Sequence, residues 1–224
     1  MNNGKSIARL VGVLFIVGTA AGILSAVFTG SILESADLLA EVSANENRVI
    51  MGTLSVLIMG ISLALVPVIV YPILRECNEA LALGYVVFRG ALETFAYIVT
   101  AISWLSLVAL SKGYASTVSP DNTSLQSMSR LLLGVSEQTN SITMILFSLG
   151  ALMFYYLLYQ SRLIPKWLSG WGLVAASIYL AAGVSALFGA QLAIALLPLA
   201  LQEMVMGVWL IVKGFNLSAI TSQA

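Results

Sequence analysis

Apolar side chains fill six long runs of the chain, and polar side chains gather in the short segments between these runs. Each run holds about as many residues as a helix needs to cross a ~30 Å hydrocarbon layer. The runs cover residues 10–32, 49–74, 81–110, 141–158, 167–188 and 192–212. Because lipid offers the backbone no hydrogen-bond partner, we expect every run to be helical. The pattern predicts an all-α polytopic bundle of six spans, which forms a single transmembrane domain over residues 1–224.

A polar stretch precedes the fourth run. Between residues 136 and 143, every side chain except that of Ile142 is polar. A polar vestibule that faces outward would explain this stretch. So would a helix that begins near Ser141, with the preceding residues at the wet interface. We favour the second interpretation, and we expect residues 124–137 to form an interfacial helix that leads into the fourth span.

Lysine and arginine are distributed unevenly between the two sides of the predicted bundle. The side of the N-terminus carries Lys5, Arg9, Arg75, Arg162, Lys166 and Lys213, and the opposite side carries Arg48, Lys112 and Arg130. The positive-inside rule therefore predicts that both termini are cytoplasmic. Aromatic side chains near the inner ends of the spans predict an interfacial belt, made of Tyr71, Tyr85, Tyr159, Trp167, Trp171 and Trp209.

Composition narrows the class of protein further. The chain is 59% hydrophobic and 9% charged, which fits a membrane protein and not a soluble domain. Ten basic and ten acidic residues cancel, so no nucleic-acid partner is expected. Histidine is absent and cysteine occurs once, and no nucleophile elbow or phosphate-binding loop is present. We therefore predict no catalytic residue, no metal ligand set and no cofactor, and the sequence gives an enzyme little support.

Three ionisable residues lie inside the predicted spans. Arg89 and Glu93 are four residues apart on one face of the third span, and Glu203 is in the sixth. Counted from the inner surface, all three fall about 13 to 20 Å deep. Each costs roughly 2.5–3.5 kcal/mol or more if it faces lipid. We therefore predict that the third and sixth spans are adjacent and that Arg89 lies between the two carboxylates.

Two roles for these charges stay open. One guanidinium and two carboxylates leave a surplus negative charge, which would bind a proton, a cation or a cationic small molecule. Alternatively, Arg89, Glu93 and Glu203 form a hydrogen-bonded clasp that only fixes the register of the helices.

Two prolines are candidates for breaks in helices beside such a site. Pro67 leaves the carbonyl of Leu63 without its usual partner, and Pro198 does the same to Ile194. Broken helices near the midplane are a common feature of carriers. A simple kink is the alternative interpretation.

Small residues recur along the first span. Gly18, Gly22 and Ala26 follow one another at four-residue spacing, which permits the close approach of another helix. Packing inside the protein's own bundle is the favoured interpretation, and a dimer face is the alternative.

Three segments carry a resemblance to a known family. Residues 78–93, 159–167 and 203–215 resemble the bacterial six-helix membrane proteins grouped as domain of unknown function 4386. The resemblance covers residues 8–215 and implies a single helical domain, a multi-pass protein of the bacterial inner membrane. It implies no activity, substrate or cofactor, and the chain departs from the family pattern at residues 137–141.

The sequence thus supports two main functional hypotheses. The first is a membrane protein that binds or carries a small solute or a proton through Arg89, Glu93 and Glu203. The second is an accessory or scaffold subunit with no site of its own, which binds a membrane partner or a second copy through the first span. A water-accessible cavity that reaches the three charges favours the first hypothesis, and a dry clasp with an apolar groove along Gly18 and Gly22 favours the second.

Overall fold

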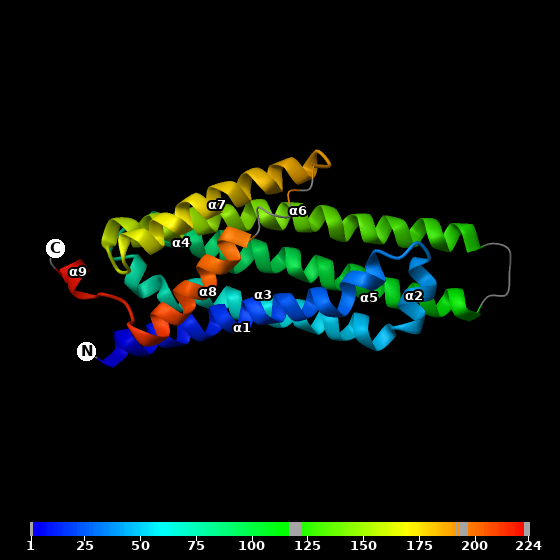
Figure 1. The fold of residues 1–224 in the computed structure, drawn as a ribbon, viewed down its shortest axis with the longest axis horizontal. Helices are drawn as coiled ribbons and strands as arrows, with labels where there is room; N and C mark the ends of the chain where they lie inside the picture. Colours follow the sequence, from blue (N-terminus) through cyan, green and yellow to red (C-terminus); the bar gives the residue numbers. More distant parts are fainter. Residues whose placement is uncertain (1, 117–121, 191, 193–196, 222–224) are drawn as a thin grey trace.

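A computed structural model describes residues 2–116, 122–190, 192 and 197–221 (Figure 1). These residues form helices and connecting turns, and no strand occurs among them. The elements in chain order are α1 (Asn2–Leu33), α2 (Leu38–Ala44), α3 (Glu46–Leu74), α4 (Glu79–Tyr85), the π-helix η1 (Val86–Leu92), α5 (Glu93–Ser116), α6 (Asn122–Ser161), α7 (Lys166–Leu187), α8 (Leu197–Val212) and α9 (Ser218–Thr221).

Five helical stretches are long and apolar enough to cross a membrane. They are Gly4–Leu33, Glu46–Leu74, Glu79–Tyr114, Thr123–Ser161 and Lys166–Leu187. The predicted sixth span, 192–212, contains the apolar α8, which has 16 residues and is about 24 Å long. Residues 193–196 of that span lie outside the described part of the chain. The five long helices indicate a membrane-embedded protein.

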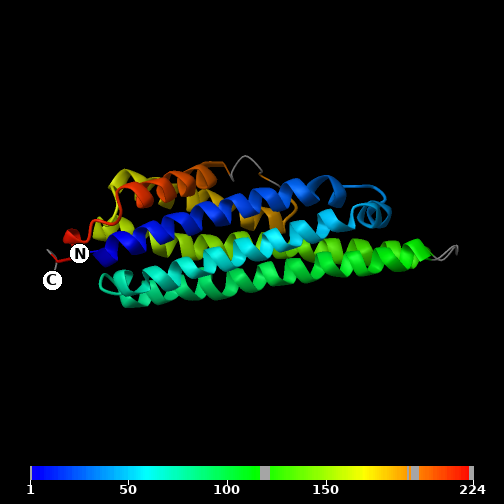
Figure 2. The ribbon, with the colours of Figure 1, turned by 90° about the horizontal axis from the view of Figure 1, so that it is seen from below.

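The long helices lie side by side along one axis of the molecule (Figures 1 and 2). α1 packs along α3, and α6 packs along both α5 and α7. α8 packs mainly on α1 and α7, and it covers the half of the bundle that holds the start of α1 and α9. The short α2 packs on α5 at the opposite end.

Apolar side chains occupy both the core of the bundle and its outer surface. The core contains buried apolar residues from several helices, among them Val66, Phe154, Leu168 and Met206. Large apolar side chains also cover the outside, such as Phe95, which is 66% exposed. An outer surface of this kind is expected where lipid, not water, is the solvent.

The expected start of the fourth span near Ser141 is wrong. α6 is one continuous helix from Asn122 to Ser161, so residues 124–137 belong to it and do not form a separate interfacial helix. The hydroxyls of the polar stretch hydrogen-bond the helix's own carbonyls. Thr139 donates to Val135 O at 2.7 Å, and Thr143 donates to Thr139 O at 2.7 Å. Helix formation itself therefore satisfies these polar groups, and they do not end the helix.

Two residues of the predicted aromatic belt lie together at the end of the bundle that holds the start of α1 and α9. Trp167 and Trp209 pack edge to face with ring centroids 6.3 Å apart. Tyr85 is an exception, because it is buried and stacks on Phe154 at 4.5 Å. Its phenol ring faces the core from α4, so the sequence placed it wrongly at the interface.

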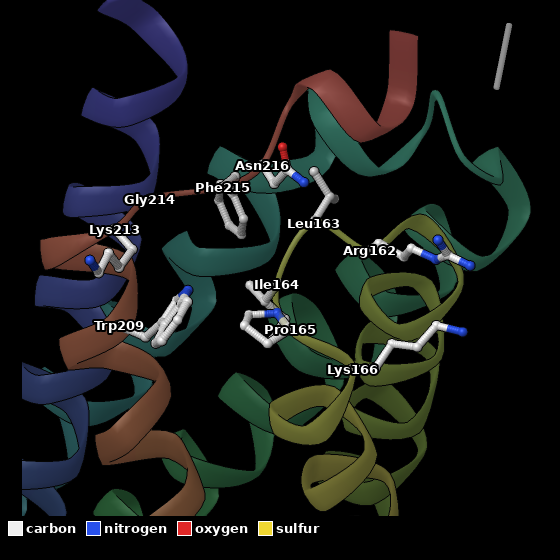
Figure 3. A pocket seen from close by; sticks show the side chains of 10 residues that line it. All are labelled: Arg162, Leu163, Ile164, Pro165, Lys166, Trp209, Lys213, Gly214, Phe215 and Asn216. Carbon is white, nitrogen blue, oxygen red and sulfur yellow. The ribbon is translucent and has the colours of Figure 1, made fainter. Parts of the chain in front are cut away.

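A cavity of about 540 Å³ lies at this same end, between the α6–α7 turn and the segment after α8 (Figure 3). The turn contains Arg162 with a positive φ of 56°, and Asn216 N–H donates to Leu163 O at 2.9 Å. Arg162 and Lys166 point away from Lys213. These basic groups therefore do not converge on a shared position in the cavity.

Candidate functional site

Arg89 lies in the middle of the π-helix η1, which interrupts the long helix made of α4, η1 and α5. The wider backbone pairing is seen at its end, where Glu93 N–H donates to Phe88 O, five residues earlier. Short π-helical segments inside α-helices occur frequently at functional sites. The sequence analysis did not predict this segment.

Glycines allow η1 and α4 to lie close against α6. A Cβ added at Gly150 would be 3.2 Å from the backbone nitrogen of Arg89 and 3.3 Å from its Cβ. A Cβ at Gly84 would be 2.6 Å from the sulfur of Met153. The backbone that carries Arg89 is therefore held directly against the fourth long helix.

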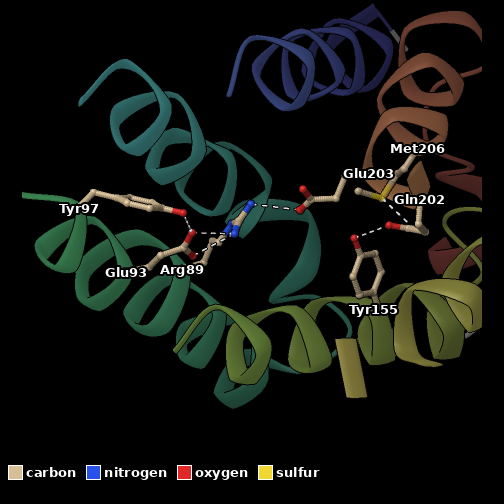
Figure 4. A network of polar contacts seen from close by, with 7 residues as sticks. All are labelled: Arg89, Glu93, Tyr97, Tyr155, Gln202, Glu203 and Met206. Carbon is tan, nitrogen blue, oxygen red and sulfur yellow. Dashed lines mark hydrogen bonds and ion pairs between the residues drawn. The ribbon is translucent and has the colours of Figure 1, made fainter. Parts of the chain in front are cut away.

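Arg89 lies between the two carboxylates, as the depth argument predicts (Figure 4). Its Nη1 donates to Glu93 Oε1 at 2.8 Å and to Oε2 at 3.0 Å. Its Nη2 donates to Glu203 Oε1 at 3.1 Å. The guanidinium carbon also lies 4.2 Å from the ring centroid of Phe147 on α6, in a cation–π contact.

The two carboxylates differ in their surroundings. Glu93 is fully buried, and it also accepts a hydrogen bond from the Tyr97 hydroxyl at 2.8 Å. The side chain of Glu203 is 12% exposed, and only its Oε1 has a hydrogen-bond partner within the described residues. No buried side-chain nitrogen or oxygen of those residues lacks a partner, so the unpartnered Glu203 Oε2 keeps some exposed surface.

α8 contacts Arg89 through the side chain of Glu203, although the helix itself packs mainly on other elements. The sequence analysis expected the third and sixth spans to be neighbours, but α8 packs mainly on α1 and α7. α1 and α8 cross where a Cβ at Gly207 would be 3.1 Å from Gly12 O. The long side chains of Arg89 and Glu203 bridge the remaining distance.

A second polar contact fixes the rotation of α8 beside the cluster. The Tyr155 hydroxyl donates to Gln202 Oε1 at 2.6 Å, and Gln202 Nε2 donates to Leu168 O on α7 at 3.1 Å (Figure 4). Both Tyr155 and Gln202 are buried. Because Gln202 immediately precedes Glu203, these bonds hold the carboxylate toward Arg89.

A cavity of about 380 Å³ adjoins the cluster. Its walls include Arg89, Glu203 and Tyr97, and Phe147 and Tyr179 supply two further aromatic walls. Glu93 is fully buried behind Arg89 and is not among the lining residues. Two of the three predicted charges therefore line a cavity, and the third holds Arg89 from behind.

Comparison with known protein families gives a match over most of the chain. A family model described as a domain of unknown function, DUF4386, matches residues 10–214. The chain belongs to the DUF4386 family. No curated protein and no solved structure matches it. The resemblance drawn from the sequence is thus confirmed, and no relative supplies a function for the site of this DUF4386 protein.

The small residues of α1 contribute to another wall of the cavity. Gly18, Gly22 and Ala26 all line it. A Cβ at Gly18 would be 2.6 Å from Leu63, and one at Gly22 would be 2.8 Å from Met59. In this DUF4386 protein the glycines therefore pack against α3 inside the bundle, which is the favoured interpretation of the sequence pattern.

The two prolines have different positions. Pro67 is buried within α3, and a Cβ at Gly90 in η1 would lie 3.5 Å from its ring. Pro198 occupies the first turn of α8, a position that proline tolerates. The predicted helix break at Pro198 is therefore absent from α8, and Ile194 lies outside the described residues.

The chemistry available at the site is ionic. One guanidinium and two carboxylates carry a net charge of −1 when ionised. Among the described residues, no three His, Cys, Asp or Glu side chains gather as a metal ligand set. Of the two carboxylates, that of Glu203 is the more exposed one.

Proposed function

We propose that this DUF4386 protein is a multi-pass protein of the bacterial inner membrane that binds a proton or a small cationic solute at Glu203 and carries it across. The observation that supports the proposal is the Glu203 carboxylate, which lines a cavity of about 380 Å³ and whose Oε2 has no hydrogen-bond partner among the described residues. A carboxylate in a membrane interior is costly to keep without a cation or a proton. The negative charge left over by Arg89 makes Glu203 the group that takes one.

In this proposal the residues of the cluster have two different roles. Arg89, Glu93 and the half-buried Tyr97 form a clasp in which the Glu93 carboxylate is fully hydrogen-bonded. This clasp is the structural role that the sequence left open. Glu203 is the mobile part, because a single hydrogen bond attaches it to Arg89.

The proposed topology has six crossings, with α8 as part of the sixth and both termini in the cytoplasm. The start of α1 and α9 lie at the same end of the bundle, as an even number of crossings requires (Figure 1). That end also carries Lys5, Arg162, Lys166 and Lys213, which the positive-inside rule puts in the cytoplasm.

The competing hypothesis is an accessory or scaffold subunit that binds a partner through α1. It needs the small residues of α1 to be free for another helix. Gly18 and Gly22 instead pack against Leu63 and Met59 of α3, and Ala26 is the exposed member of the three. The contacts therefore favour a site within the bundle.

Flux in proteoliposomes tests the proposal with two probes, the proton and radiolabelled tetramethylammonium. Liposomes with the purified protein are expected to pass at least one probe faster than empty liposomes. Glu203→Gln is expected to lower that flux to the level of empty liposomes, because the amide keeps the size of the side chain and removes its charge. Glu137→Gln, at an exposed position of α6, is the matched control and is expected to keep the flux.

Two outcomes contradict the proposal. One is a wild-type flux of both probes equal to that of empty liposomes. The other is a flux that Glu203→Gln leaves unchanged while the variant elutes as folded protein.

A further inference from the structure

The cavity beside Glu203 has an apolar rim on the outside of the bundle. Ile23, which lines it, is 61% exposed, and Ala26 and Ala200 are exposed as well. Ile23 lies ten residues before Leu33, the last residue of α1, which corresponds to about 15 Å along the helix. The rim therefore lies at the depth of the hydrocarbon layer and not at its surface.

The interior of the cavity is aromatic on one side. Phe147 and Tyr179 pack edge to face with centroids 5.2 Å apart, and Tyr97 lines the wall beside them. Aromatic faces attract organic ammonium and similar cations through the ring quadrupole. Glu203 adds a carboxylate to the same cavity, beside the guanidinium of Arg89.

We propose that the ligand is a lipophilic organic cation that enters the cavity sideways from the bilayer. This inference rests on the proposed function, because it assigns a substrate class to the Glu203 site. A cation is selected by the net charge of the cluster, and its apolar part is selected by the aromatic walls. The apolar rim favours molecules that already partition into lipid over strongly hydrated ones.

The size of the cavity agrees with such a ligand. A volume of about 380 Å³ lies in the range of pockets that bind small organic molecules. An anion of the same size and shape meets a cluster whose net charge is −1 when ionised, because Glu93 and Glu203 together outweigh Arg89. Charge, and not size or lipophilicity, therefore decides which of two matched ions binds.

Equilibrium binding of tetraphenylphosphonium to the purified full-length protein tests the inference. Tetraphenylborate, an anion of nearly the same size and lipophilicity, is the matched probe, and empty micelles supply the background. The wild type is expected to bind the phosphonium at one site per chain at least tenfold more tightly than the borate. Glu203→Gln is expected to weaken phosphonium binding at least tenfold, and Glu137→Gln is expected to leave it unchanged.

A second pair of variants tests the lateral entrance. Ala26→Trp places a bulky ring on the rim of the cavity, whereas Val27→Trp places the same ring at the next, lipid-facing position, which is 64% exposed. Ala26→Trp is expected to slow phosphonium association at least fivefold, and Val27→Trp is expected to leave the rate unchanged. Equal rates for both variants would overturn the lateral route.

The outcomes separate this inference from the function on which it rests. If flux of protons or tetramethylammonium depends on Glu203 but phosphonium binding does not exceed borate binding, the substrate class is wrong and the cation site stands. If neither flux nor phosphonium binding depends on Glu203, both proposals are wrong.

Discussion

At the scale of residues, the two buried carboxylates have separate tasks. Glu93 accepts both hydrogen bonds from Arg89 Nη1 and a third from Tyr97, so its oxygens are fully engaged. Glu203 accepts one hydrogen bond, and its Oε2 has no hydrogen-bond partner among the described residues. The Glu93 carboxylate, which accepts three hydrogen bonds, stabilises the fold. The Glu203 carboxylate, which accepts one, can exchange Arg89 for another partner.

Tyr97→Phe tests the clasp. The variant removes the hydroxyl that donates to Glu93 at 2.8 Å, and it is expected to lower the free energy of unfolding by about 1.5–3 kcal/mol, as for hydrogen bonds to charged groups. Denaturant unfolding in mixed micelles measures the change. Tyr156→Phe is the control, because the Tyr156 side chain is 49% exposed on the same bundle. Equal losses in the two variants would argue against a clasp.

The sequence predicts the contact among Arg89, Glu93 and Glu203 because an unpaired charge in lipid is costly and few partners exist at that depth. It does not predict Phe147, Tyr155 or Gln202. These side chains carry no charge, and nothing in their cost of burial indicates which neighbour they meet. Only the packing of α6 and α8 brings them to the site.

At the scale of elements, the π-helix η1 is the feature that presents Arg89. It lies against α6 at Gly150, where no side chain separates the two backbones. A wider helical turn and a glycine on the facing helix therefore occur at the same contact. This combination brings the guanidinium over the ring of Phe147, one turn before Gly150.

Gly150→Ala tests this contact. The added methyl group would lie 3.2 Å from Arg89 N, and a backbone atom cannot move aside easily. The substitution is expected to destabilise the protein by about 1–3 kcal/mol, the usual cost of overpacking. Gly134→Ala on the same helix has nothing within 4 Å of the new methyl group, so it is expected to cause no loss. Thermal unfolding in detergent compares the two, and equal midpoints would contradict close packing at Gly150.

Most helices are predictable from the apolar runs, but two details are not. The π-helix has no marker in the hydrophobic pattern, because its register change depends on contacts with α6. The length of α6 is underestimated because Ser and Thr read as polar in the sequence. In the helix, their hydroxyls are satisfied by carbonyls one turn earlier.

At the scale of the whole molecule, the bundle is asymmetric. α8 covers the half that holds the start of α1 and α9, whereas α2 closes the other end on α5 (Figures 1 and 2). The cavity lies beside the first residues of α8, at Leu199 and Ala200.

Cysteine labelling tests the proposed topology. In a Cys77→Ser background, Ala36→Cys lies before α2 at one end, and Asn216→Cys lies after α8 at the other. A membrane-impermeant maleimide added to intact cells is expected to label the cysteine at 36 and not that at 216. Permeabilised cells are expected to show both. The opposite pattern in intact cells would contradict cytoplasmic termini.

The most direct test of the cation site is a crystal structure of the protein in complex with tetraphenylarsonium, whose arsenic is located by anomalous scattering. We predict one arsenic peak in the cavity, with a phenyl ring against Tyr179 and the positive charge facing Glu203, and no peak there in Glu203→Gln crystals. Wild-type crystals at a saturating concentration without arsenic in that cavity, or with the same peak in the variant, would contradict the account.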